Sequence, residues 1–202
     1  MITRLYNAKE QAILEGVIRL INSGADAGSL TAEDMAKSAG IGKGTLYLYF
    51  SSKEDILSHA IGYCIQNQLR ELEAAAGREG TFHSRVTAAL SCLRDSAARG
   101  NAVFRLMISG LLGEEFYQRF GGEFRKEVQS WLDQILDSLI RAGVRDGVFS
   151  ASQETDYLHQ VILGAALGFC YRYLCPPCPD GKAVQRGMDY ALYMVIAAGK
   201  EE

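Results

Sequence analysis

The chain has 202 residues, of which 48% are hydrophobic and 22% are charged, and it contains only three prolines. This composition excludes wholesale disorder, because the apolar side chains can bury enough surface to offset the entropy of ordering the backbone. The formal net charge of -3 excludes a protein that coats nucleic acid through an overall excess of positive charge, so any contact with DNA must be local.

Hydrophobic periodicity predicts an amphipathic helix near the N-terminus. Its apolar residues recur at spacings of three, four and eight, and they are Leu5, Ile13, Val17, Leu20 and Ile21. We expect this stripe to be the buried face of the first helix.

A short capped helix is predicted to begin after Thr31. The Thr31 hydroxyl can accept a hydrogen bond from the amide three residues on, while the Asp34 carboxylate reaches back, which is a capping box. The helix is expected to end near Ser38, because Gly40 suits the left-handed conformation that follows a helix.

A third helix is predicted over about residues 42–50, directly after a tight turn. Leu46 and Phe50 are four residues apart and would lie on one buried stripe of this helix. The adjoining stripe carries Lys43, Gly44, Tyr47 and Leu48. Two short helices separated by such a turn are what a helix-turn-helix requires, with the second helix entering the major groove of DNA.

The rest of the chain is expected to be helical. A second capping box at residues 52–55 opens a helix over 53–76, which connects the two predicted domains. Further helices are predicted near residues 81–99, 101–112, 115–146 with a possible break at Gly121–Gly122, 153–174 and 181–198. No segment shows the strict alternation of a strand. The sequence therefore predicts an all-α fold, with a three-helix DNA-binding domain over residues 1–52 and a larger helical domain over 53–202.

Local charge and residue chemistry favour DNA as the partner of the first domain. Every formal charge from Ala36 to Lys53 is positive. Glycine lets a backbone approach the duplex, lysine reaches base acceptors or phosphates, and hydroxyl groups donate to phosphates. The predicted DNA-contacting residues are Thr31, Lys43, Gly44, Thr45, Tyr47, Tyr49 and Lys53. The alternative is an ordinary helical hairpin with the same caps and apolar residues.

About residues 10–60 resemble the DNA-binding signature of TetR-family regulators. The resemblance rests on the order and spacing of Thr31 to Gly40, of residues 41–50 (IGKGTLYLYF) and of Lys53-Glu54. Gly42 departs from the family, which often has a serine cap there, and so leaves a weaker cap. The resemblance implies an all-α homodimer whose larger domain binds a small molecule, and ligand binding then moves the DNA-binding domains and usually releases the operator.

The larger domain supplies candidates for a ligand pocket and a dimer interface. Aromatic and adaptable side chains suit an apolar or aromatic effector, and they are Phe104, Met107, Phe116, Tyr117, Phe120, Trp131, Tyr157, Phe169 and Tyr171. Small residues on the last two helices suit a four-helix dimer interface, and they are Gly164, Ala165, Gly168, Ala191 and Val195. Packing within one chain is the alternative reading for both sets.

Two other chemistries compete with DNA binding. The glycine-rich segment 40–45 suggests a nucleotide-binding enzyme, but a Walker loop needs Ser or Thr directly after Gly-Lys, and here Gly44 intervenes. Cys175 and Cys178 form a CxxC pair that could sense redox state or hold zinc, although two ligands do not complete a zinc site; a symmetry mate or His159 would have to supply the rest.

No catalytic motif accompanies these features. The histidines lack a metal-ligand spacing and no serine lies in a nucleophile elbow, so we expect no enzyme activity, no metal and no cofactor. The longest apolar run, residues 161–170, is shorter than the ~18 residues that cross a bilayer. We therefore expect a cytoplasmic protein without a membrane partner.

Overall fold

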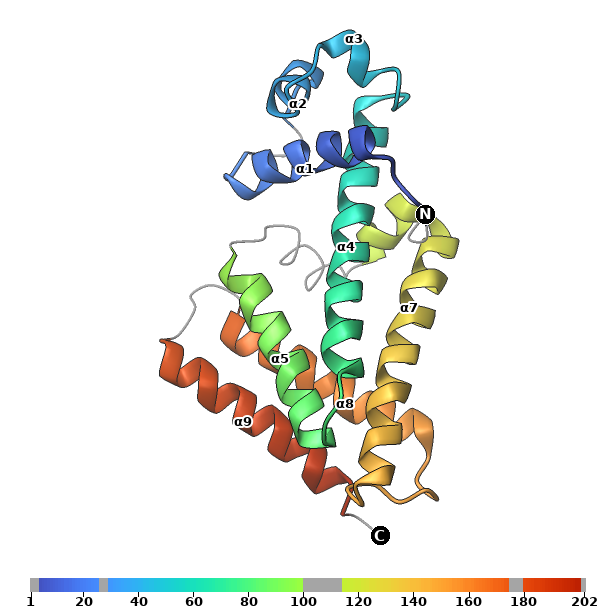
Figure 1. Ribbon diagram of the computed structural model, residues 1–202, viewed down its shortest axis with the longest axis vertical. Helices are drawn as coiled ribbons and strands as arrows, with labels where there is room; N and C mark the ends of the chain where they lie inside the picture. Colours follow the sequence, from blue (N-terminus) through green and yellow to red (C-terminus); the bar gives the residue numbers. More distant parts are fainter. Residues whose placement is uncertain (1–3, 26–28, 100–113, 175–179, 201–202) are drawn as a thin grey trace. The chain divides into compact units, whose positions relative to one another are not determined.

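The structure is a computed structural model that describes residues 4–25, 29–99, 114–174 and 180–200, with side chains from residue 122 onward in the helix that begins at Glu114. Within these ranges every regular element is a helix, as the sequence predicts (Figure 1). The elements are α1 (Ala8–Asn22), α2 (Ala32–Ser38), α3 (Lys43–Leu46), α4 (Lys53–Gly77), α5 (Phe82–Ala98), α7 (Glu114–Arg145), α8 (Thr155–Phe169), the π-helix η1 (Cys170–Leu174) and α9 (Gly181–Ala198). No helix among the described residues is both long and apolar enough to span a membrane.

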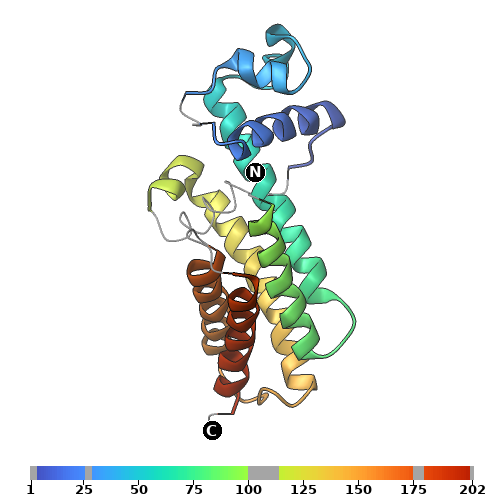
Figure 2. The same cartoon turned by 90° about the vertical axis from the view of Figure 1, so that its left-hand side faces the viewer.

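The chain divides into two compact units. The head unit contains residues up to 68 together with the first part of α7, up to residue 127, and the body unit contains residues 69–99 and those from 128 onward. Within the head unit, α1, α2 and α3 gather around the first turns of α4 (Figures 1 and 2). The functional division predicted at residue 52 stays a prediction.

The first helix begins later than its hydrophobic pattern suggests. Asn7 caps α1 and accepts hydrogen bonds from the amides of Lys9 and Glu10, while the Glu10 carboxylate accepts one from the Asn7 amide. Leu5 therefore lies outside the helix and is 85% exposed, so its predicted place on the buried stripe is wrong. Ile13, Val17 and Ile21 are buried as predicted, and Leu20 is half-buried.

The backbones of α1 and α2 approach closely at Gly16. A Cβ atom on Gly16 would lie 3.0 Å from the amide nitrogen of Ala39, at the end of α2. The Ser38 hydroxyl donates to the Gly16 carbonyl oxygen over 2.8 Å, and the Arg19 guanidinium donates to the Ser38 carbonyl oxygen over 3.1 Å. These contacts fix the packing of α2 against α1.

The later helices differ from the predicted ones in two places. The break considered at Gly121–Gly122 is absent, because α7 continues through both glycines and Phe124 in the following turn is buried. The segment predicted as one helix over 153–174 instead changes from α8 to a π-helical turn at Cys170. α8 and α9 lie side by side in both views, at the orange to red end of the colour scale (Figures 1 and 2).

Candidate nucleic-acid interface

The predicted capping box fixes the start of α2. The Thr31 hydroxyl donates to the Asp34 carboxylate over 2.6 Å and accepts from the Asp34 amide over 3.2 Å, while the Thr31 amide donates to the same carboxylate over 3.0 Å. The hydrogen bond from the Thr31 side chain, with that from its backbone, holds the pKa of Asp34 below its ordinary value. Thr31 is exposed at this helix end, and Gly40, with a φ of 69°, makes the turn that follows α2.

The third helix is shorter than predicted. α3 covers only Lys43–Leu46, after Gly42, which has extended backbone angles and gives no side-chain cap. The amides of Leu48 and Tyr49 donate to carbonyl oxygens three residues back, at 3.2 Å each, so the chain tightens into a turn. Segment 40–45 thus forms the turn between two helices and the start of the second, which is not the strand-loop-helix setting of a phosphate-binding loop.

Burial separates the two sides of this short segment. Leu46 is completely buried and Phe50 is 2% exposed, so both anchor the segment to the head unit as predicted. On the other side, Tyr47 is 44% exposed and Leu48 is 81% exposed. Lys43 and Gly44 are also exposed, whereas Thr45 and Tyr49 are half-buried. Lys43, Gly44 and Tyr47 are therefore accessible, Thr45 and Tyr49 are partly so, and the contact of these residues with DNA stays a prediction.

Thr45 and Tyr49 line a shallow depression of about 260 Å³ on the head unit. Residues of α1, among them Lys9 and Ile13, line it together with Ile41 of the turn. Lys9 is exposed here and adds a positive charge beside two hydroxyl groups. The sequence gives no sign of this neighbour, because the approach of α1 to α3 depends on tertiary packing.

The start of α4 is capped by a variant of the predicted box. The Ser52 hydroxyl accepts from the Asp55 amide over 3.1 Å, but the Asp55 carboxylate accepts from the amide and hydroxyl of Ser51, over 2.9 and 3.0 Å. Burial raises the pKa of Asp55, yet these two hydrogen bonds and His59 outweigh it and leave the pKa below its ordinary value. Lys53, the last predicted contact residue, is the first residue of α4 and is half-buried.

A polar cluster around His59 of α4 packs against Phe50. The centroid of the His59 ring lies 5.5 Å from that of Phe50. His59 also lies within 3.0 Å of the Tyr6 hydroxyl, 3.1 Å of the Arg4 guanidinium and 3.3 Å of the Asp55 carboxylate. The segment before α1 is thereby tied to α4. This cluster has no sequence motif and was not predicted.

Residues 13–60 match the model of the family described as bacterial regulatory proteins, tetR family. This part of the chain is therefore similar to the DNA-binding region of TetR-family regulators. Over 99 residues the chain is 31% identical to the nucleoid occlusion factor SlmA of Actinobacillus pleuropneumoniae serotype 5b (strain L20), a match that covers 49% of each protein. The chain thus spans about half the length of the curated relatives that it matches.

Solved structures with the TetR fold cover nearly the whole chain. The fatty acid degradation regulator FadR of Bacillus halodurans aligns with a TM-score of 0.71 at 17% identity, over 98% of this chain and 100% of that one. FadR of Bacillus subtilis in complex with stearoyl-CoA aligns with a TM-score of 0.65 at 18% identity, over 93% and 97% of the two chains. The TetR-type arrangement of a helix-turn-helix followed by a helical domain is therefore present in this chain.

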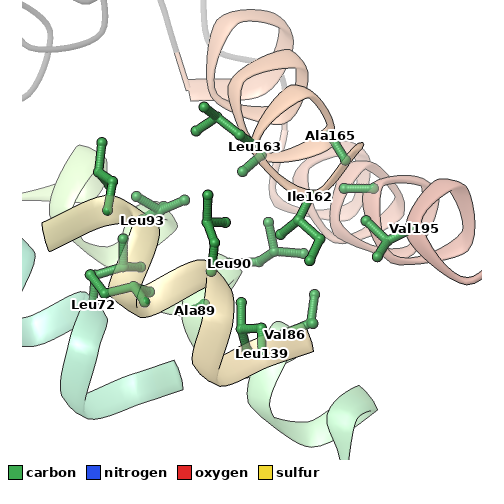
Figure 3. A pocket seen from close by; sticks show the side chains of 15 residues that line it. Leu72, Val86, Ala89, Leu90, Leu93, Leu139, Ile162, Leu163, Ala165 and Val195 are labelled. Carbon is green, nitrogen blue, oxygen red and sulfur yellow. The ribbon is translucent and has the colours of Figure 1, made fainter. Parts of the chain in front are cut away.

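The body unit of this TetR-fold chain contains an apolar cavity of about 70 Å³ between α5, α7, α8, α9 and the end of α4 (Figure 3). All of its lining side chains are those of leucine, isoleucine, valine or alanine. They include Leu90, Leu136, Leu139, Ile162, Ala165 and Val195. A site of this kind can hold a hydrocarbon group but offers it no hydrogen-bond partner.

The predicted aromatic pocket residues are not part of this lining. Phe104, Met107 and the side chains of Phe116, Tyr117 and Phe120 lie outside the described residues. The Trp131 indole donates to the Glu73 carboxylate over 3.1 Å, and the Phe169 ring stacks on that of Tyr173 at 5.9 Å. Tyr157 and Tyr171 are 39% and 70% exposed. The described cavity is therefore aliphatic, and an aromatic pocket elsewhere stays a prediction.

The predicted dimer residues fall into two groups. Gly164 and Gly168 are exposed on α8. Ala165, Ala191 and Val195 are buried and line the cavity within the chain, as the alternative reading has it.

The predicted CxxC residues Cys175 and Cys178 lie outside the described residues. The His159 ring, considered as a further zinc ligand, is hydrogen-bonded to Asp137 over 2.8 Å.

Proposed function

We propose that the chain is a homodimeric transcriptional repressor that binds an operator through α3 and leaves it when a small apolar molecule enters the body unit. The observation that carries this proposal is the accessible side of residues 43–49. This side carries the Lys43 ammonium group, the Tyr47 hydroxyl group and Gly44, which has no side chain. The buried residues Leu46 and Phe50 anchor the segment to the head unit. Donors displayed in this way suit phosphates and base edges. Such a repressor acts in the cytoplasm, where the DNA lies.

An exposed apolar face on the body unit supports the homodimer. Tyr190, Tyr193 and Met194 on α9 are 57%, 71% and 49% exposed, and Tyr171 in η1 is 70% exposed. Exposed apolar residues of this kind, together with the exposed glycines of α8, suit a second copy packed as a four-helix interface. A symmetric dimer would then place two recognition segments about one turn of DNA, ~34 Å, apart.

The aliphatic cavity supports an effector with a hydrocarbon portion. Its lining has no donor or acceptor side chain, so the polar part of the effector must be bound elsewhere. The Bacillus subtilis neighbour holds stearoyl-CoA, which has such a portion. A cavity of about 70 Å³ must widen to admit a long chain. The ligand would therefore favour a different conformation of the body unit, which is what a switch requires.

Binding of the purified protein to the DNA that flanks its own gene tests the proposal. Fluorescence anisotropy with labelled duplexes should give saturable binding that survives an excess of unrelated duplex, and stearoyl-CoA or a related acyl compound should reduce it. Equal affinity for flanking and unrelated DNA would contradict the operator proposal. Unchanged operator binding with every apolar compound would contradict the effector proposal alone.

A further inference from the structure

Leu48 is the most exposed of the large hydrophobic residues in the DNA-binding stretch. Its side chain is 81% exposed, directly after Tyr47 and within the turn that follows α3. The preceding anchor, Leu46, is completely buried, so the direction of the segment is fixed and Leu48 is kept outside the core. A leucine held in this way adds little to the packing of the head unit and is available to a partner that meets this segment.

Gly44 leaves the neighbourhood of Leu48 open. Gly44 lies in α3 and Leu48 in the turn that directly continues it, and both residues are exposed. A Cβ atom built on Gly44 would meet no other atom within 4 Å. The exposed surface of residues 43–48 therefore includes a position without any side chain, where a flat base edge can approach.

The chemistry of base edges selects one partner for a leucine in the major groove. Hydrogen-bond donors and acceptors mark guanine, cytosine and adenine there, whereas thymine adds a 5-methyl group. Leucine has no polar atom in its side chain and can favour only the methyl group. Lys43 and Tyr47 on the same side can hydrogen-bond to phosphates or bases.

We propose that Leu48 is a specificity-determining residue that contacts the 5-methyl group of a thymine in each operator half-site. The inference rests on the proposed function, since it deepens the reading of the same DNA-binding site. A two-fold symmetric dimer makes the contact once per half-site, at positions related by the symmetry of the operator.

Replacement of thymine by deoxyuridine tests this contact, because uracil lacks only the methyl group. The operator is first selected from random duplexes with the wild-type protein, and each thymine of one half-site is then replaced singly. We expect one position at which the replacement weakens binding about fourfold, the effect of withdrawing one methyl group from an apolar contact. Leu48→Ala should weaken binding to the thymine duplex and bind thymine and uracil duplexes equally at that position.

Leu5→Ala is the matched control, because Leu5 is equally apolar, 85% exposed and part of the same head unit. This variant should keep the wild-type preference for thymine. Three results would overturn the inference. The wild-type protein could bind every uracil duplex as tightly as the thymine duplex. Leu48→Ala could keep the preference for thymine, or it could bind the thymine duplex as tightly as the wild type does. A wild-type protein that selects no duplex would instead contradict the proposed function, so the two failures are distinguishable.

Discussion

The Tyr6 hydroxyl lies 3.0 Å from Nδ1 of His59 and joins the segment before α1 to α4. The two rings meet edge to face, with centroids 5.8 Å apart. Burial, together with the Glu10 and Asp55 carboxylates, raises the pKa of Tyr6 to about 12, against the opposing effect of Arg4. Tyr6 therefore stays neutral and can keep this hydrogen bond over a wide range of pH.

The stability of the head unit should fall as the pH drops below about 6.5, the ordinary pKa of histidine. Burial and the Arg4 guanidinium lower the pKa of His59, and the Asp55 and Glu10 carboxylates oppose this only in part. The unfolded chain therefore takes up the His59 proton at a higher pH than the folded chain does. The stabilisation is fully present above the unfolded pKa and is lost as the pH falls through the folded pKa.

Thermal unfolding between pH 7.5 and 5.5 checks this prediction. His59→Gln should show a smaller drop in Tm over this range than the wild-type protein. His83→Gln, which removes an exposed histidine of α5 in the body unit, serves as the control for the loss of a histidine. The same drop in Tm for His59→Gln and wild type would show that His59 does not produce the pH dependence.

Gly16→Ala should destabilise the head unit by about 1–3 kcal/mol, the usual cost of overpacking. The new Cβ would lie 3.0–3.1 Å from backbone atoms of Ser38 and Ala39, which cannot move aside like a flexible side chain. Gly122→Ala is the control, because its Cβ would meet nothing within 4 Å and alanine favours the helix α7. In denaturant unfolding, we expect Gly16→Ala to lower the midpoint concentration of denaturant and Gly122→Ala not to lower it. An unchanged midpoint for Gly16→Ala would mean that α1 and α2 can move apart without cost.

The parts of this structure that depend on neighbouring residues in the chain could be predicted from the sequence. The Thr31–Asp34 cap and the turn at Gly40 arise from local hydrogen bonds and backbone conformation, and both are present. The prediction for Leu5 is wrong because its spacing from the later apolar residues fits a helix, whereas the Asn7 cap makes α1 begin only at Ala8. Local sequence rules compete in such cases, and the hydrogen-bonded cap decides the boundary.

Features that depend on tertiary packing could not be predicted. The position of Lys9 beside Thr45, and that of Tyr6 against His59, follow from how α1 lies on the other helices of the head unit. The cavity has the same origin: many apolar residues of the body unit satisfy the helical pattern, and only packing determines which of them, such as Leu139 and Ile162, border an empty volume.

Tyr193→Asp should convert the proposed dimer into a monomer. The side chain is 71% exposed on α9, so the change costs little within one chain, whereas a charge placed in an apolar interface loses its hydration. Sedimentation equilibrium should give the monomer mass, and operator binding should weaken with it. Leu5→Asp, at an exposed position of the head unit, should remain dimeric. A dimeric Tyr193→Asp variant would place the interface elsewhere.

Ala165→Leu should make operator binding insensitive to an apolar effector. Ala165 is 6% exposed and lines the cavity, so a larger side chain occupies the volume that the hydrocarbon portion would enter. Operator binding without the effector should be retained. Ala74→Leu, at an exposed position of α4, should respond to stearoyl-CoA as the wild type does. Equal release of Ala165→Leu and wild type by the effector would exclude this cavity as its site.

The proposed function requires that the accessible side of α3 binds the operator. The dissociation constant of Lys43→Ala for the selected operator, measured over a range of salt concentrations, tests this requirement most directly. We expect binding at least about tenfold weaker than wild type, with a shallower dependence on salt if Lys43 contacts phosphate. Tyr47→Ala should also weaken binding, while Lys182→Ala, which removes an exposed charge of α9, should not. Wild-type affinity in both Lys43→Ala and Tyr47→Ala would contradict the assignment of this surface to DNA.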